Sequence, residues 1–181
     1  MEITKTLYVE NRAEWRNWFA KNGAVEAEIW LIYPRKTSGR TRIPYSDAVE
    51  EALCFGWIDG IEKPLDSQNS AQRFTPRRAK SNWSQLNKER ARRLIAAGKM
   101  TQVGIAVMGD LDSEFQIAPD ILQALQADAT TYAHFQNFPD YYQRIRIGFI
   151  EEARKQPDVF QKRLANFLKK TAQNKRFGTL V

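Results

Sequence analysis

The sequence predicts an α+β fold, in which a small, mostly antiparallel sheet is flanked by helices and an all-helical C-terminal part follows. Four short segments in the first half are expected to be strands, and the clearest of them, residues 28–33, alternates, is rich in β-branched and aromatic residues and ends at Pro34. The last third instead repeats apolar residues at intervals of three, four and seven, the spacing of one helix face. With 181 residues, 43% of them apolar, the chain can bury a core of its own.

In the first half, strands and helices are expected to alternate. A helix should begin after Asn11, because Asn11 and Glu14 have the spacing of a capping box, and it should end at Gly23. A second helix should run from the capping residue Ser46 to about Phe55. The expected strands are residues 7–9, 28–33, 57–63 and 71–75.

The second half is expected to be helical. Gly98 should close a helix over residues 85–97, and Thr101 can cap a short one. Pro119, Pro139 and Pro157 each suit the first turn of a further helix, the second of them running through Lys155. The apolar residues that should dock these helices are Ile145, Phe149, Phe160, Leu164, Phe167 and Leu168.

The expected domain organisation has three parts. Residues 1–108 form an α+β core, residues 109–118 a link, and residues 119–181 a helical part that packs on the core as one compact unit.

Several classes of protein are disfavoured by what the sequence lacks. The N-terminus has no apolar run of signal-peptide type and no stretch approaches the length of a membrane span, so a cytoplasmic location is expected. One cysteine, Cys54, and one histidine, His134, provide neither a disulfide nor the usual zinc ligands, and no metal or cofactor is expected. Without a glycine-rich phosphate loop, a dinucleotide fingerprint or a serine elbow, an enzyme is the less favoured class.

Positive charge is concentrated in residues 72–99. This segment holds nine lysine or arginine residues against one acid, Glu89, so it carries a charge of +8 where the whole chain carries +7. A focused positive field favours an anionic partner. The sequence therefore predicts an anionic small molecule as ligand, with nucleic acid as the alternative, and it identifies no protein partner.

The stretch Gly56-Trp57-Ile58-Asp59-Gly60 places a carboxylate between two glycines, which suit close backbone approach. Alternation along a strand puts Trp57 and Asp59 on one face, an aromatic plate beside an acid. Asp59 is then either a ligand-binding residue or the partner of an arginine.

Arg73, Arg77 and Arg78 lead into the helix that begins after Ser84. Helix N-termini offer unpaired N–H groups and partial positive charge, so arginines placed there can complete an anion site. The alternative is a solvated basic loop.

Within that helix, a projection at 100° per residue selects the binding candidates. Trp83 and Asn87 fall on one inward stripe with Ile95, and Arg90 borders it, whereas Lys88 and Arg92 point outward. The ligand-binding candidates are therefore Trp57, Asp59, Arg73, Arg77, Arg78, Trp83, Asn87 and Arg90.

Two residues, Asp59 and Cys54, are weaker candidates for a catalytic role. Asp59 could act as a general base. Cys54 could become a nucleophilic thiolate near arginines, although a lone cysteine is more often a packing residue.

Over about Tyr33 to Gly104 the sequence resembles the YdeI/OmpD-associated, bacteriocin-protection family. The resemblance lies in Tyr45, AVEEALCFGWIDG (48–60), RFTPR (73–77), SNWS (81–84), Asn87, Gly98, Met100-Thr101 and Gly104. It implies a small cytoplasmic bacterial protein linked by name to bacteriocin protection and envelope stress, and it brings no established catalytic mechanism.

Three functions remain open at the level of the sequence. The first is binding of a phosphate- or carboxylate-bearing ligand in a basic, aromatic-lined pocket. The second is nucleic-acid binding through residues 72–99, and the third is an enzyme of unassigned class that acts on an acidic metabolite with Asp59 as general base.

Overall fold

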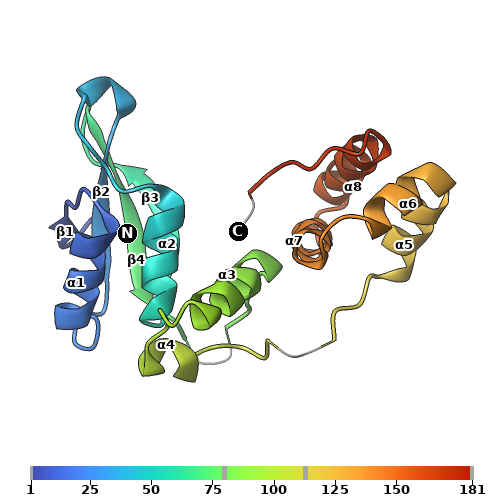
Figure 1. The fold of residues 1–181 in the computed structure, drawn as a ribbon. Helices are drawn as coiled ribbons and strands as arrows, with labels where there is room; N and C mark the ends of the chain where they lie inside the picture. The colour runs from blue at the N-terminus through green and yellow to red at the C-terminus, as the bar shows by residue number, and fades with distance from the viewer. Residues whose placement is uncertain (1, 79–80, 112–113, 180–181) are drawn as a thin grey trace. The chain divides into compact units, whose positions relative to one another are not determined.

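The computed structural model describes residues 2–78, 81–111 and 114–179, and it shows the α+β class that the sequence predicts (Figure 1). The chain divides into two compact units. The first contains residues 1–81 and 94–109, and the second contains residues 82–93 and 110–181. Part of the expected link, residues 112–113, lies outside the described residues.

The first unit is built on a four-stranded mixed sheet in the order β1-β2-β4-β3. Only the β1–β2 pair is parallel; β2–β4 and β4–β3 are antiparallel. Because side chains alternate along a strand, Ile29, Leu31 and Phe74 share one face. The strands are β1 (Thr6–Leu7), β2 (Ile29–Pro34), β3 (Trp57–Pro64) and β4 (Asn69–Pro76).

Helices α1 (Arg12–Asn22) and α2 (Tyr45–Cys54) lie against this sheet (Figure 1). The Trp15 ring meets the Phe74 ring edge-on at 5.3 Å between centroids, which joins α1 to the apolar face of the sheet. Asn11 caps α1 as predicted, since its side chain accepts a hydrogen bond from the Glu14 amide.

The short helix α4 (Gln102–Ala106) packs on the carboxyl end of α2. Thr101 caps it and donates both its amide and its hydroxyl to the Cys54 carbonyl, at 3.1 and 2.7 Å. Gly56 has a left-handed φ of 74°, which turns the chain from α2 into β3.

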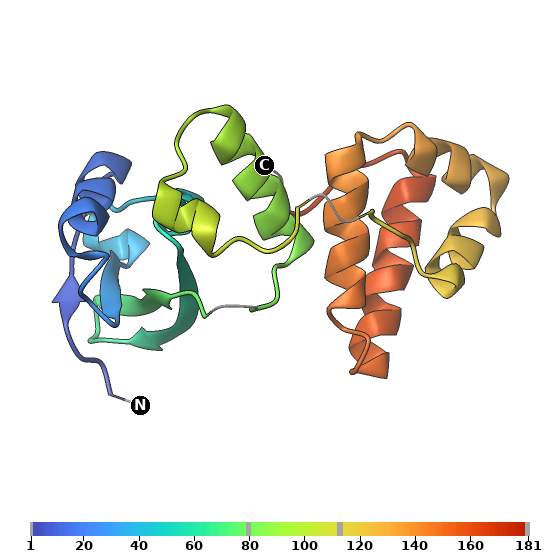
Figure 2. The same cartoon turned by 90° about the horizontal axis from the view of Figure 1, so that it is seen from below.

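The second unit is helical (Figure 2), and it has its own hydrophobic core. Gln85–Arg93 of helix α3 (Gln85–Ala96) belong to it, and the rest of α3 belongs to the first unit. Phe135 and Phe167 pack edge to face in the core, as do Phe138 and Tyr142. Its other helices are α5 (Pro119–Gln126), α6 (Ala129–Gln136), α7 (Asp140–Glu151) and α8 (Pro157–Ala172).

Some element boundaries differ from the expectation. Helix α2 begins at Tyr45, after Pro44, so Ser46 lies within its first turn and is not its cap. Helix α7 ends at Glu151, short of Lys155. Phe149, expected to dock inward, is 42% exposed, and two arginines lie over its ring. None of the helices in the described part of the chain combines the length and hydropathy that a membrane crossing requires.

Candidate functional site

The candidate site is a polar hollow of about 610 Å³ in the first unit, at the end of β2. A second hollow of about 500 Å³ shares Tyr33, Arg42 and Glu62 with it. The two hollows together are called the Tyr33 pocket. Its remaining lining residues are Pro44, Tyr45 and Gln72 in the first hollow and Arg35, Lys36, Lys63, Pro64 and Ser70 in the second.

A bulge in β3 brings two carboxylates to the face of the sheet that bears this pocket. Asp59 pairs with Phe74, and Glu62 pairs with Gln72, so β3 has one residue more than β4 between these pairs. In a regular strand, Asp59 and Glu62 are three positions apart and would face opposite sides. The extra residue places both on the face of Gln72, which is also the face of Tyr33.

The Tyr33 hydroxyl is the unusual group in the pocket. The Tyr33 side chain is 6% exposed, and its buried Oη has no hydrogen-bond partner among the described residues. Burial raises the pKa of this phenol well above its ordinary range, and Tyr45, Asp59 and Glu62 raise it further, while Arg42 lowers it. The phenol is therefore a protonated donor at neutral pH, and leaving such a buried group unpaired costs about 1–3 kcal/mol.

The groups around Tyr33 are held in place by contacts of their own. The Arg42 guanidinium lies 5.8 Å from the centre of the Tyr33 ring and donates to the Pro34 carbonyl at 3.2 Å. The Tyr45 hydroxyl donates to Asp59, and the Ser70 hydroxyl donates to Glu62. Gln72 donates through Nε2 to the Gly60 carbonyl at 2.7 Å.

The charge of the pocket is uneven. The second hollow is lined by four basic residues, Arg35, Lys36, Arg42 and Lys63, and by the single acid Glu62. The first hollow adds tyrosine and amide groups but no further cation. One end of the pocket therefore suits an anionic group, and the other suits neutral hydrogen-bonding groups.

The ligand-binding residues that the sequence predicts lie in several parts of the structure. Trp57 is buried in an aromatic cluster with Trp18 and Phe19, where its Nε1 donates to the Gly23 carbonyl at 3.1 Å. Arg73 forms an ion pair with Glu28 at 2.6 Å.

Arg77 and Arg78 differ in exposure. Arg77 is buried and donates to the Ser81 hydroxyl at 3.0 Å. Burial lowers the pKa of its guanidinium, and Asp59 opposes that effect. Arg78 is exposed. Asp59 contacts a residue of the Tyr33 pocket, because it accepts a hydrogen bond from the Tyr45 hydroxyl.

Trp83, Asn87 and Arg90 belong to the second unit. Arg90 is 5% exposed and donates to the Asn87 amide oxygen at 3.0 Å. The sequence candidates are thus divided between the two units, and a single pocket formed by all of them stays a prediction.

Two residues of α3 differ from the helical projection. Ile95, expected on the inward stripe, is 41% exposed. Arg92, expected to point outward, bonds to Glu89 and to the Leu111 carbonyl. Arg92 departs from the projection because Glu89, which is buried, binds both Arg92 and Arg144. Part of the charged face of α3 therefore faces the protein interior.

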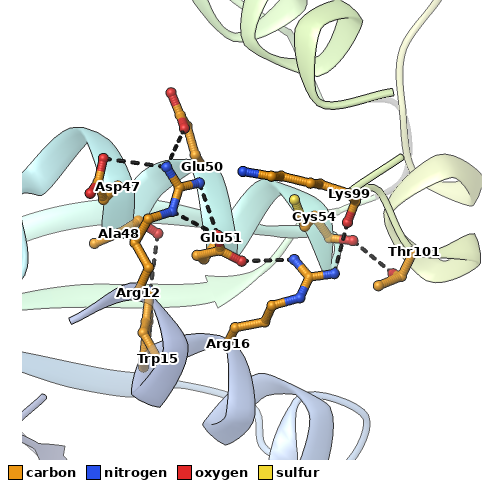
Figure 3. A network of polar contacts seen from close by, with 10 residues as sticks. All are labelled: Arg12, Trp15, Arg16, Asp47, Ala48, Glu50, Glu51, Cys54, Lys99 and Thr101. Atoms are coloured by element: carbon orange, nitrogen blue, oxygen red, sulfur yellow. Dashed lines mark hydrogen bonds and ion pairs between the residues drawn. The ribbon is translucent and has the colours of Figure 1, made fainter. Parts of the chain in front are cut away.

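A second polar cluster joins α1 to α2 (Figure 3). Arg12 forms ion pairs with Asp47, Glu50 and Glu51 at 3.4, 3.0 and 2.9 Å. Arg16 pairs with Glu51 at 2.8 Å and donates to the Lys99 carbonyl at 2.9 Å (Figure 3). This cluster links helices through paired charges, which is a structural role.

Cys54 lies at the edge of the same cluster (Figure 3), and it is fully buried. Burial raises the pKa of its thiol, Glu51 raises it further, and Arg16 lowers it. These surroundings favour the neutral thiol over the thiolate that nucleophilic chemistry needs. In the described residues, histidine, cysteine, aspartate and glutamate side chains nowhere gather in threes as a metal site requires.

Sequence reasoning missed Tyr33, Arg42, Glu62 and Gln72 as site residues. The bulge that brings Glu62 onto the pocket face has only Gly60 as a sequence signal, and a glycine in a strand has several other uses. Pro34 and Pro44, which flank the loop bearing Arg42, were the better signal, because two prolines restrict the backbone at both ends of that loop.

Two family models match two different parts of the chain. Residues 7–107 match the model of a domain of unknown function (DUF8412). Residues 114–174 match the model described as bacteriocin-protection, YdeI or OmpD-associated. This is the family that the sequence resembles, but the motifs that carry the resemblance lie within the residues that match the other model.

Neither a comparison with curated proteins nor one with solved structures gave a match. The two family models meet close to the division between the α+β part and helices α5–α8. The chain therefore belongs to the family of the domain of unknown function DUF8412, whose model covers more than half of it, and its residues 114–174 are similar to the model described as bacteriocin-protection, YdeI or OmpD-associated.

Proposed function

We propose that the protein binds a small molecule that carries an anionic group together with hydroxyl groups, and that the Tyr33 pocket holds it. The observation that carries this proposal is the buried Tyr33 hydroxyl, which has no partner among the described residues. A bound oxygen acceptor would satisfy that donor and remove the cost of leaving it unpaired.

The chemistry of the ligand follows from the two ends of the pocket. Phosphate or carboxylate suits the cationic end formed by Arg35, Lys36, Arg42 and Lys63, because arginine binds such groups through two parallel hydrogen bonds. Hydroxyl groups suit the first hollow, which adds Tyr45 and Gln72 to the shared residues Glu62, a carboxylate acceptor, and Tyr33, a donor. A phosphorylated polyol or sugar combines both features.

Nucleic-acid binding through residues 72–99 has less support. It needs basic side chains spread over an open face. Arg77 and Arg90 are buried, and Arg73 and Arg92 form ion pairs with acids. Several of the basic residues that suggested nucleic-acid binding are therefore buried or paired with acids.

The proposal is tested by calorimetry with glycerol 3-phosphate, inorganic phosphate and glycerol as probes. We expect glycerol 3-phosphate to bind more tightly than phosphate, and glycerol alone not to bind. Arg42→Gln should weaken glycerol 3-phosphate about tenfold or more, since a hydrogen bond to a charged group contributes about 1.5–3 kcal/mol. Arg78→Gln, which changes an exposed arginine outside the pocket, should leave the affinity unchanged.

Tyr33→Phe separates a binding role from a structural one. The substitution removes an unpaired buried hydroxyl, so the free protein should be as stable as wild type or more stable by about 1 kcal/mol. Its affinity for glycerol 3-phosphate should fall about threefold to tenfold. Lower stability of Tyr33→Phe without ligand, or equal affinity in wild type and Arg42→Gln, would refute the proposal.

A further inference from the structure

A second buried donor, which has no acidic partner among the described residues, lies in the helical unit. The proposed function does not use this place. Arg146 of α7 is 6% exposed. Its Nη2 donates to the Thr179 carbonyl at 3.2 Å, while its Nε has no hydrogen-bond partner among the described residues. No carboxylate of the described residues forms an ion pair with it.

This arrangement differs from that of the neighbouring arginines. Arg144 binds Glu89, and Arg154 binds Asp120 and Glu151. Arg146 instead lies among aromatic rings, with its guanidinium carbon 5.9 Å from the centre of the Tyr142 ring and 5.5 Å from those of Phe149 and Phe177. Burial lowers the pKa of this guanidinium. A charge so placed is costly unless an anion pairs with it.

The turn after α8 completes these surroundings. Asn174 has a left-handed φ of 53°, and the Lys175 amide returns to the Lys170 carbonyl at 3.0 Å, which ends the helix with a Schellman-type bond. The chain then passes back over α7, where the Phe177 amide donates to the Tyr142 hydroxyl at 3.2 Å. Phe177 and Thr179 are thereby brought to Arg146.

An apolar hollow of about 200 Å³ opens beside the guanidinium. Its apolar walls come from α7, α8 and the returning segment, and its cationic residues are Arg146, Lys162 and Arg163. A cavity of about 150 Å³ accepts benzene, so this one is large enough for one aromatic ring with a small substituent. The apolar walls are Phe149, Ile150, Val159, Phe167 and Phe177.

Arg163 supports the cationic side of the hollow. Its guanidinium carbon lies 3.7 Å from the centre of the Phe149 ring, and it donates to the Phe149 carbonyl. Phe149 thus lies close to two arginines, Arg146 and Arg163. Glu152 lines a further hollow that also contains Arg146, and no ion pair joins those two side chains in the described residues.

We propose that this hollow binds a small aromatic carboxylate. The ring occupies the apolar walls between α7 and α8, and the carboxylate accepts hydrogen bonds from the Arg146 guanidinium, with Arg163 and Lys162 adding positive charge. The ligand supplies an anion, which the described residues do not bring to Arg146. This site lies in the second unit and is independent of the Tyr33 pocket.

Titration of the whole protein with phenylacetate, 2-phenylethanol and 2-phenylethylamine tests the charge requirement without any substitution. Backbone amide shifts in a ¹⁵N-labelled sample locate the binding and give the affinity. We expect phenylacetate to bind at least tenfold more tightly than the neutral alcohol, the cationic amine not to bind, and the shifts to centre on α7 and α8. Equal binding of the three compounds, or no phenylacetate binding up to 10 mM, would overturn the proposal.

Three variants test the residues. Arg146→Gln should weaken phenylacetate at least tenfold. Asn166→Trp, which adds an aromatic ring at an exposed position lining the hollow, should block binding while Arg146 stays in place, and so it remains informative if Arg146→Gln folds poorly. Arg154→Gln, which changes an arginine outside the hollow, is the matched control and should bind like wild type. Wild-type affinity in both Arg146→Gln and Asn166→Trp would contradict the proposed site.

Discussion

Gly104 shows how closely one residue can fix the packing of two helices. A Cβ at this position would lie 2.3 Å from the Cys54 carbonyl oxygen and 3.0 Å from that of Leu53, both backbone atoms at the end of α2. Backbone atoms cannot move aside as the end of a side chain can. Helix α4 can therefore pack on α2 at this distance only with glycine at position 104.

We expect Gly104→Ala to lower the free energy of unfolding by about 1–3 kcal/mol, the usual cost of overpacking. Gly60→Ala is the comparison, because a Cβ there would meet its nearest atoms at 3.7 and 3.8 Å, an ordinary contact. Its effect should stay within about 0.5 kcal/mol. Urea unfolding followed by tryptophan fluorescence measures both, and equal losses would argue against close packing at Gly104.

At the residue scale, the sequence predicted which face of the strand Asp59 shares with Trp57 and missed the residues around it, while the role of Asp59 stays a prediction. The alternation that placed Trp57 and Asp59 on one face holds only up to the bulge, and the carboxylate that lines the pocket is Glu62. Tyr33 reads as an ordinary strand aromatic, because nothing in a sequence tells whether a buried hydroxyl finds a partner. Such facts depend on the contacts between elements.

At the element scale, α1 and α2 are joined by charged groups inside an otherwise apolar interface. Glu51 is 3% exposed and binds both Arg12 and Arg16, which remain partly exposed. The nearby Trp15 Nε1 donates to the Ala48 carbonyl at 3.1 Å. Since one carboxylate serves two guanidinium groups, its loss leaves both with fewer partners.

Glu51→Gln is expected to destabilise the protein by about 1–3 kcal/mol, because hydrogen bonds to charged groups are lost at a buried position. The matched change Glu26→Gln breaks the surface pair with Lys5, which is more exposed, and should cost no more than about 0.5 kcal/mol. Thermal or urea unfolding distinguishes the two. If Glu51→Gln proved as mild as Glu26→Gln, the cluster would contribute little to stability.

The start of a helix could be predicted to within a few residues wherever the sequence shows a recognisable capping residue. Asn11 and Thr101 cap their helices through side-chain oxygens, as expected. The break between α5 and α6 was not foreseen, although Asp128 caps α6 by accepting from the Thr131 amide. The end of α7 also went unpredicted, because residues after Glu151 continue as turns that pack Ala153 into the core.

At the scale of the whole molecule, several acids are stabilised in their charged form. A hydrogen bond from Thr4, together with Arg73, lowers the pKa of Glu28, and one from Asn69 lowers that of Asp66. In the second unit, Arg154 lowers the pKa of Asp120, and the contact with Thr131 lowers that of Asp128. Each group contributes stability above its unfolded pKa, about 3.9 for aspartate, and loses it as the pH falls through the lower folded value.

Stability should therefore be nearly flat above about pH 5 and should decline below about pH 4. Asp128→Asn keeps an oxygen that can cap α6 but does not titrate, so the loss at acid pH should be shallower in this variant. Urea midpoints measured between pH 2.5 and 7 provide the comparison. An acid dependence as steep as that of wild type would show that Asp128 does not contribute to it.

At this scale, each of the two compact units is made of two separate stretches of the sequence. The sequence places its boundary between a core and a helical part near residues 109–118, and the family models also meet there. Residues 82–93 nevertheless belong to the helical unit, since Glu89 binds Arg144 and Gln85 lies against Gly148. A helix that contributes to two units cannot be assigned by its own periodicity.

Because Cys54 is buried, its reaction with a thiol reagent can report the opening of the first unit. It is the chain's single cysteine, it is inaccessible in the folded first unit, and its carbonyl ties α2 to Thr101. A thiol reagent can therefore react only when α2 and α4 separate or the unit unfolds. The rate of labelling measures the free energy of that opening, in the wild-type protein and without any attached probe.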